Sequence, residues 1–355
     1  MHTDILIVGG GLSGLALADA LQQMDVDFQL VEARDRLGGR IKVADVDGAK
    51  FDLGPAWFWP GQPRVAAAAT RFGLTVFEQY SAGDIVAEDQ NGMVRRGAGF
   101  ASMAGSLRLD GGMGALVDAY QAALPADRLH LGQRITAITQ TEAGITATAQ
   151  DVTITAQTVV LATPPRIAAQ IAFDPALPDA QTHAMNDIPT WMAGHAKYIG
   201  VYDRPVWRDA GLSGDAQSRR GPMFEIHDAS PHSGGPSAVF GFIGFDAQTR
   251  ATHTDDMHAM AKDQLTRLFG SLPDQLIFQD WAQQGDTATP ADFTPTGHPA
   301  YGRPPALQWI WDGNVILGSS EMGKTFGGFL EGALEAAQDV ASQIAGNRYT
   351  LTHRP

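Results

Sequence analysis

The start of the chain alternates between apolar and polar blocks that predict a strand, a helix and a second strand. Residues 3–8 (TDILIV) form a short, β-branched apolar run that ends at glycine, as buried parallel strands do. Residues 28–33 (FQLVEA) form a second such run. Between the two runs, apolar side chains recur at helical spacing at Leu12, Leu15, Ala16 and Leu21. This order of elements predicts a βαβ unit.

Similar patterns further along the chain predict more strands and helices. Alternation of apolar and polar positions over residues 129–165 predicts a β-meander, which ends in an apolar strand stopped by two prolines. Residues 257–270 predict a helix, and residues 276–283 predict a strand. Residues 314–346 predict a strand, a glycine-rich loop and a long amphipathic helix. No internal repeat interrupts this order.

Composition narrows the class of protein. A chain of 355 residues with 44% hydrophobic residues has enough apolar surface for one large or two interleaved domains. The net charge of -14 argues against a nucleic-acid partner and weakly favours a cationic substrate. The absence of cysteine excludes disulfides, thiolate catalysis and a cofactor linked through sulfur. No histidine spacing typical of a metal site occurs, so we predict no metal.

The sequence also predicts where the protein resides. The chain enters an apolar strand at once, without the features of a secretory signal. No apolar run approaches the roughly 20 residues that a membrane helix needs. We therefore expect a soluble, cytoplasmic protein without a membrane partner.

Glycines follow the first predicted strand in the pattern of a dinucleotide-binding loop. Gly9, Gly11 and Gly14 form G-x-G-x-x-G at the start of the predicted helix, whose N-terminus favours a pyrophosphate. Glu32 stands at the end of the second strand, where an acid accepts hydrogen bonds from ribose hydroxyls. A glycine-rich turn without a ligand is the alternative, but strand, helix and acid in register favour the nucleotide.

A second glycine pair distinguishes a flavin from a nicotinamide nucleotide. Gly38 and Gly39 precede Arg40, and FDLGPAWFW follows over residues 51–59. A nicotinamide domain does not need these residues. With them, the N-terminus resembles that of the FAD-dependent amine oxidase family, the relatives of monoamine oxidase and polyamine oxidase.

The resemblance implies a cofactor and the residues that hold it. In the family the arginine that matches Arg40 contacts the diphosphate, the loop that matches Gly54 to Trp57 runs beside the isoalloxazine, and Ile135 would lie against the adenine. An acid in the position of Glu321 lies near the ribityl chain, although a helix-capping carboxylate fits that position too. The cofactor implied is FAD, bound non-covalently by Gly9, Gly11, Ser13, Gly14, Glu32, Arg34, Gly39, Arg40, Gly54, Ala56, Trp57, Ile135, Glu321, Phe329 and Leu330.

The resemblance also implies an α/β fold with two domains. A Rossmann-like FAD-binding domain would be built from the discontinuous segments 1–62, 107–185 and 290–355. An α+β substrate domain with a mixed sheet would comprise 63–106 and 186–289. Between Trp57 and Ser106 the chain is much shorter than in typical members, which leaves the shape of the substrate cavity open.

Lys197 is the candidate catalytic residue. It lies in the alternating run HAKYIGVYD, where a lone lysine also fits a solvent-exposed edge of a sheet. The surrounding segment, however, is similar to the family segment that delivers a lysine to the flavin N5 through a water molecule. The resemblance therefore implies a catalytic role near the reacting ring.

Aromatic side chains are the candidate substrate contacts. Family members place two facing rings before the flavin, and the resemblance implies Phe329 as one wall, with Phe326 nearby. At the expected second wall stand Thr289, Pro290 and Ala291, so we expect this wall to be incomplete or rebuilt. Tryptophans are the candidates for rebuilding it, although core positions suit them equally well; these are Trp57, Trp59 and Trp281.

Two adjacent arginine pairs leave the charge of the substrate open. Arg95-Arg96 and Arg219-Arg220 fit either a site for a substrate carboxylate or a solvated surface.

The resemblance implies a flavin amine oxidase. Such an enzyme oxidises a C–N bond of a small amine to an imine, and O2 reoxidises the flavin to give hydrogen peroxide. Two alternatives remain open at this point: a related flavoprotein that desaturates or oxidises another class of substrate, and a flavin-binding protein without turnover. The oligomeric state stays open.

Overall fold

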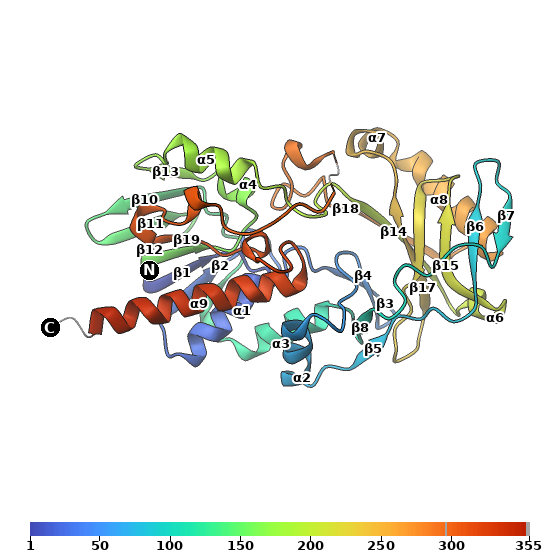
Figure 1. The fold of residues 1–355 in the computed structure, drawn as a ribbon, viewed down its shortest axis with the longest axis horizontal. Helices are drawn as coiled ribbons and strands as arrows, with labels where there is room; N and C mark the ends of the chain where they lie inside the picture. The colour runs from blue at the N-terminus through green and yellow to red at the C-terminus, as the bar shows by residue number, and fades with distance from the viewer. Residues whose placement is uncertain (295–296, 353–355) are drawn as a thin grey trace.

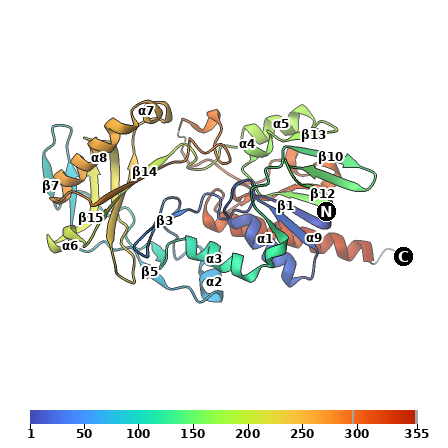
Figure 2. The same cartoon turned by 180° about the vertical axis from the view of Figure 1, so that it is seen from behind.

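The protein is elongated and has two lobes, each built on one large sheet (Figure 1). The computed structural model describes residues 1–294 and 297–352. Residues 295–296 and 353–355, which fall in the expected segment 290–355, lie outside the described residues. The last described helix, α9 (Leu330–Thr352), runs toward the far end of the first lobe (Figure 2).

The first lobe is built on an eight-stranded sheet. The predicted βαβ unit is present as β1 (His2–Val8), α1 (Leu12–Gln23) and β2 (Phe28–Val31), and β1 pairs in parallel with β2 on one side and β12 on the other. The predicted meander forms the antiparallel strands β10, β11 and β12. The remaining bounds are β9 (Leu129–His130), β10 (Ala137–Thr141), β11 (Gly144–Thr148), β12 (Thr153–Leu161), β13 (Ala172–Asp174) and β19 (Val315–Leu317).

Both faces of this sheet are covered. Along β1, Ile5 and Ile7 enter one core and Leu6 and Val8 enter the other, because successive strand side chains point to opposite faces. On the first face α1 lies beside the long C-terminal helix α9 (Leu330–Thr352) (Figure 1). The other helices of this lobe are α2 (Pro63–Arg71), α3 (Gly114–Ala123), α4 (Pro165–Ala168) and α5 (Asp179–Asn186).

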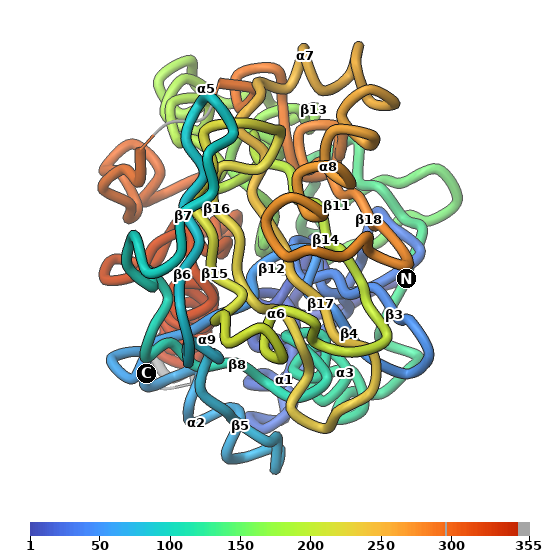
Figure 3. Tube along the Cα trace, turned by 90° about the vertical axis from the view of Figure 1, so that its right-hand side faces the viewer, coloured from blue at the N-terminus to red at the C-terminus, as the bar shows by residue number. Residues whose placement is uncertain are grey.

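The second lobe, which lies nearest the viewer in Figure 3, is built on a seven-stranded mixed sheet. Its order is β18-β14-β17-β16-β15-β6-β7, with β15 and β6 parallel and the other pairs antiparallel. The bounds are β6 (Asp84–Glu88), β7 (Val94–Arg96), β14 (Ala196–Tyr202), β15 (Leu212–Ser218), β16 (Met223–Asp228), β17 (Ser237–Ile243) and β18 (Gln275–Asp280). The strand β14 is therefore interior to the sheet.

Helices and hairpins complete the second lobe and the join between the lobes. The helix α8 (Thr254–Phe269), predicted from the sequence, packs on one face of the sheet, and the other face meets the hairpin of β3 (Val43–Val46) and β4 (Ala49–Asp52). The short helices α6 (Val206–Asp209) and α7 (Ala247–Thr252) lie at the ends of strands, and β5 (Val76–Glu78) pairs with β8 (Leu107–Leu109). The sheets thus meet through segments from the N-terminal third of the chain.

Candidate functional site

A cavity of about 640 Å³ runs between the two lobes. Its wall is formed by the start of α1, by loops that leave strands of the first sheet, and by residues of β14, β16 and β17. Most of the residues predicted to bind cofactor or substrate line it: Gly9, Gly11, Ser13, Glu32, Arg34, Gly39, Arg40, Gly54, Ala56, Trp57, Ile135, Lys197, Trp281, Phe329 and Leu330. Of the other predicted residues, Gly14, Glu321 and Phe326 are not part of the lining.

Gly11 and Gly14 of the N-terminal loop have different surroundings. A Cβ atom on Gly14 would lie 2.0 Å from the carbonyl oxygen of Gly9, so Gly14 permits close packing of α1 on the strand. A Cβ atom on Gly11 would meet no atom closer than 4.0 Å, the distance to Cα of Gly39. The backbone of Gly11 is therefore open to the cavity at the N-terminus of α1, where a phosphate is favoured.

Glu32 is held in place at the cavity wall. Its side chain is buried, with Oε2 accepting a hydrogen bond from the Gly10 backbone at 2.7 Å and Oε1 accepting one from the Arg34 backbone at 2.9 Å. A carboxylate has about four acceptor positions, so these two bonds leave capacity for ligand hydroxyls. Arg34 in turn donates to Oγ1 of Thr287 at 2.7 Å, which ties this loop to the segment after β18.

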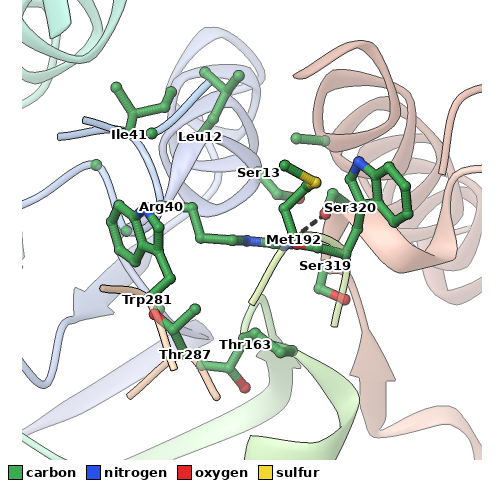
Figure 4. A pocket seen from close by; sticks show the side chains of 18 of the residues that line it. Leu12, Ser13, Arg40, Ile41, Thr163, Met192, Trp281, Thr287, Ser319 and Ser320 are labelled. Atoms are coloured by element: carbon green, nitrogen blue, oxygen red, sulfur yellow. Dashed lines mark hydrogen bonds between the residues drawn. The ribbon is translucent and has the colours of Figure 1, made fainter. Parts of the chain in front are cut away.

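Arg40 presents a fixed positive charge to the cavity (Figure 4). Its Nη2 atom lies 2.8 Å from Oγ of Ser320 and 2.8 Å from Oε1 of Glu321, and its Nη1 atom donates to the carbonyl oxygen of Trp191 at 3.2 Å. Because Glu321 is fully buried behind Arg40, it orients the guanidinium and does not line the cavity. The glycine loop and Arg40 together fit the diphosphate of a dinucleotide.

Lys197 is buried in the interior of the second sheet, and its side chain does not lie at a solvent-exposed edge. The residue is 5% exposed, and its ammonium donates a hydrogen bond to the carbonyl oxygen of Gly54 at 2.5 Å. The ammonium also lies 4.2 Å from the ring centre of Phe240 and 5.1 Å from that of Phe242. Burial lowers the pKa of Lys197 to about 7, although Asp52 acts in the opposite direction. A lysine with such a pKa can gain or lose a proton near neutral pH.

Two buried charges beside Lys197 were missed from the sequence. Burial raises the pKa of Asp52 to about 6, against the influence of Arg108 and a hydrogen bond from the Met113 backbone. Arg108 is also buried and donates to the carbonyl oxygens of Ala229 and Ser230. Both are charged residues inside short apolar runs, FDL and LRL. A charge flanked by apolar residues in this way is the sequence pattern that could have indicated a buried charge.

The aromatic residues around Phe329 differ from those expected. Phe329 is 38% exposed, and its nearest rings are His298, at 4.8 Å between centres, and Trp191, at 5.9 Å. Neither ring was predicted from the sequence, because both come from loops distant in the chain. Phe326 is half-buried outside the cavity lining.

Two of the three candidate tryptophans for the second wall have a hydrogen-bonded indole. Trp57 donates to Oε1 of Gln79 at 2.8 Å, and Trp281 donates to the carbonyl oxygen of Leu53 at 3.0 Å. All three, Trp57, Trp59 and Trp281, line the cavity, whereas none of the arginines of the two pairs, at positions 95–96 and 219–220, does so.

The described part of the chain offers neither a cluster of metal ligands nor a membrane-spanning helix. Across residues 1–294 and 297–352, no group of three or more His, Asp or Glu side chains is arranged to hold a metal ion. Over the same ranges, no helix has both the length and the apolar character needed to cross a bilayer.

The fold and the glycine loop in the cavity wall define a protein of the dinucleotide-binding type. Residues 80–345 match the model of the flavin containing amine oxidoreductase family, and residues 7–72 match that of the NAD(P)-binding Rossmann-like domain. The chain belongs to the flavin containing amine oxidoreductase family. The resemblance inferred from the sequence and the predicted α/β fold are thus confirmed, and family membership implies a flavin cofactor.

Proteins of similar sequence support membership of the flavin containing amine oxidoreductase family. The chain is 25% identical to a Mycobacterium tuberculosis protein with the provisional name flavin-containing monoamine oxidase AofH, over 96% of each chain. That alignment spans 456 positions, about a hundred more than this chain has residues, so the chain is the shorter of the two over the matched region. A stretch of 86 residues is 35% identical to putrescine oxidase of Kocuria rosea, covering 24% of this chain and 18% of that protein.

Solved structures show the same fold. A putrescine oxidase with bound putrescine superposes with a TM-score of 0.81 at 21% identity, over 98% of this chain and 99% of that one. Cyclohexylamine oxidase from Brevibacterium oxydans IH-35A superposes with a TM-score of 0.83 at 19% identity, over the same shares of the two chains. Each superposition includes both lobes of this protein.

Proposed function

We propose that this protein is an FAD-dependent amine oxidase that acts on a small amine. The amine would lose two electrons and two protons to become an imine, which water hydrolyses, and O2 would take up the electrons and protons as hydrogen peroxide. The observation that carries the proposal is one continuous cavity with a dinucleotide cradle in its wall and the buried ammonium of Lys197 among aromatic rings. Relatives named as oxidases of amines support the substrate class.

The residues of the cavity fit FAD as the cofactor. Gly11 and Arg40 would hold the diphosphate, Glu32 the ribose hydroxyls, and Ile135 the adenine. The chain has no cysteine, so a link through sulfur is excluded and we propose non-covalent binding. When bound, the flavin supplies a two-electron acceptor for the carbon next to nitrogen.

The residues of this chain would create the conditions for that chemistry. Trp57, Phe242 and Phe329 give the cavity apolar walls that exclude water and favour the unprotonated amine. Leu330 and Ala333, in the first turn of α9, also line the cavity, so the positive end of this helix can stabilise negative charge on the bound ring.

Lys197 would act on protons and charge at the reacting end of the cavity. With its pKa near 7 it exists in both protonation states at neutral pH, and its bond to Gly54 fixes its position. The protonated form provides a positive charge beside a site where oxygen becomes reduced, and it can donate a proton there.

A peroxide assay over a panel of primary, secondary and polyamines and amino acids tests this proposal. We expect peroxide formation with at least one amine, together with bleaching of the flavin absorbance when oxygen is removed. Heat denaturation should release intact FAD into the supernatant. Flavin that bleaches only with non-amine substrates would favour a related desaturase or oxidase, and flavin that no substrate bleaches would favour a binding protein. Flavin retained by the precipitated chain would contradict non-covalent binding.

A further inference from the structure

One row of side chains crosses the second sheet from Lys197 to an acidic residue. In the register of the strands, Lys197 on β14 is opposite Phe242 on β17, and Phe242 is opposite Glu225 on β16. Directly opposed residues of antiparallel strands share a face of the sheet, so all three point toward the cavity that they line. Two strand spacings separate the backbones of Lys197 and Glu225 by roughly 10 Å.

The carboxylate of Glu225 is fixed through one oxygen and free at the other. Its Oε1 atom accepts a hydrogen bond from Oγ of Ser102 at 2.6 Å and lies 3.3 Å from Nε2 of His227. Its Oε2 atom makes no hydrogen bond with the residues that the structure describes, and the side chain is 25% exposed at the cavity wall. Glu225 thus offers an oriented oxygen to a ligand in the cavity.

The imidazole of His227 is held behind Glu225 by a second acid. Its Nδ1 atom lies 2.8 Å from Oδ1 of Asp215, and the indole of Trp57 packs edge-on against the ring at 5.0 Å between centres. Burial alone would lower the pKa of His227, but its hydrogen bond with Asp215 and its close contact with Glu225 raise it. The contact with His227 in turn lowers the pKa of Glu225.

The acidic groups around His227 outnumber the basic ones. Two carboxylates, Asp215 and Glu225, flank the single imidazole of His227, and among the described residues neither pairs with a lysine or an arginine. One imidazole can carry at most one positive charge, so it cannot neutralise two ionised carboxylates. A partly buried, unbalanced carboxylate favours a cationic ligand, because a counterion replaces the solvation that burial removes.

Between this charge and Lys197 the cavity is apolar. Phe242 occupies the middle position of the row, and Trp57 lies beside it at 6.4 Å between ring centres. A chain of methylene groups fits this stretch, and an ammonium group at its far end would reach Glu225.

We propose that Glu225 is the specificity-determining residue of the cavity, that it binds a second, protonated amine of the substrate, and that the preferred substrates are linear diamines. This inference rests on the proposed amine oxidation, since one amine must react near Lys197 while the other pairs with Glu225. His227 and Asp215 are positioning residues that orient Glu225 and keep it ionised. Substrates with a carboxylate in place of the second ammonium are repelled.

A matched pair of amines tests the assignment. 1,5-Diaminopentane and 1-aminohexane have the same number of heavy atoms and differ in a terminal ammonium against a methyl group. Anaerobic rapid mixing with the flavin-loaded protein gives an apparent Kd and a limiting rate of flavin bleaching for each amine. For the wild type we expect the diamine to bind at least about tenfold more tightly, the effect of one charge-assisted contact.

Glu225→Gln keeps the shape of the side chain and removes its charge. We expect the apparent Kd for the diamine to rise about 10- to 100-fold, while the limiting rate stays within about threefold and the monoamine is unaffected. Glu142→Gln, on the exposed turn between β10 and β11, is the matched control and should change neither amine.

The outcomes separate the two proposals. Equal binding of the two amines by the wild type, a measurement that needs no variant, would overturn the role of Glu225 while amine oxidation stands. An equal loss for both amines in Glu225→Gln would likewise overturn it and make Glu225 a structural residue. If neither these two amines nor any other amine bleaches the flavin, the proposed function itself fails.

Discussion

The ammonium of Lys197 donates a 2.5 Å hydrogen bond to the carbonyl oxygen of Gly54, a residue 143 positions earlier in the chain. The two residues belong to different parts of the fold: Lys197 lies on β14 of the second sheet, and Gly54 follows β4. A Cβ atom on Gly54 would lie 1.9 Å from the carbonyl oxygen of Arg40, so Gly54 also allows the chain to pass close to Arg40. This contact places the candidate catalytic amine next to the loop expected beside the flavin.

Replacing Lys197 by methionine tests its role in the reaction with oxygen. Methionine has a similar volume and lacks the charge, so we expect Lys197→Met to fold and bind flavin. Reoxidation of the reduced flavin by O2 should slow at least about tenfold, equivalent to a loss of roughly 1.4 kcal/mol of transition-state stabilisation. Stopped-flow spectroscopy measures the reductive and oxidative half-reactions separately. Lys262→Met on α8 is the control, and wild-type rates in both half-reactions of Lys197→Met would remove Lys197 from the mechanism.

The lowered pKa of Lys197 predicts how stability changes with pH. Between the folded-state pKa of about 7 and the usual value of 10.5, the unfolded chain holds a proton that the folded protein does not. The free energy of unfolding of the wild type should therefore rise with pH across this window relative to Lys197→Met, and between pH 7 and pH 10 the difference should change by about 4 kcal/mol. Below pH 7 both states are protonated and the difference should be constant. Urea unfolding at pH 6 to 10, with matched flavin content, measures this difference, and parallel pH profiles would show that Lys197 titrates normally.

Two glycines of the N-terminal loop should respond differently to alanine. Gly11 has φ -73° and ψ 178°, which alanine adopts readily, and its Cβ would enter open space. Gly11→Ala should therefore keep its stability within about 0.5 kcal/mol and lose flavin affinity at least about tenfold. Gly14→Ala would place a Cβ 2.0 Å from a backbone oxygen and should destabilise the fold by about 1 to 3 kcal/mol or more. Thermal unfolding without flavin and flavin titration give the two quantities, and an unchanged flavin affinity in Gly11→Ala would place the nucleotide elsewhere.

Glu32→Ala should weaken flavin binding. Its loss removes a charged acceptor for ribose hydroxyls and leaves the N–H groups of Gly10 and Arg34 without their partner. We expect a loss of about 1.5 to 3 kcal/mol in binding free energy. Fluorescence titration of the flavin-free protein with FAD measures it, with Glu32→Gln as the conservative variant of smaller effect. Unchanged affinity would mean that Glu32 only organises the loop.

Phe329→Ala should impair amine oxidation more than flavin binding. The ring lines the cavity and is partly exposed there, so its removal opens the wall to water. We expect kcat/KM for the amine to fall at least about tenfold, a loss of roughly 1.4 kcal/mol, with the Kd for FAD nearly unchanged. Phe326→Ala, three residues earlier and outside the cavity wall, is the comparison and should have the smaller effect on kcat/KM. Equal losses of flavin affinity and activity in Phe329→Ala would make the ring part of the core.

Local patterns predicted the elements that depend on neighbours in the sequence. The period of two in β1, the glycine spacing before α1 and the helical period of α9 are short-range features, and each appears in the structure. The alternation around Lys197 predicted a strand but left open whether it was an edge strand. The pairing of β14 with both β17 and β18 answers that question, and it brings together segments that are about 40 to 80 residues apart.

The sequence by itself determined the family, the cofactor class and a set of residues that line the cavity, because a nucleotide cradle is a local motif whose glycines and acid keep a fixed spacing. Only the tertiary structure decided which charges face each other inside the cavity. Asp52, Arg108 and Lys197 come from three separate segments of the chain. Glu225 and Ser102 come from two further segments. Their neighbours depend on sheet register and on how the lobes meet, and the burial that shifts the pKa of Lys197 does not exist until the chain has folded around it.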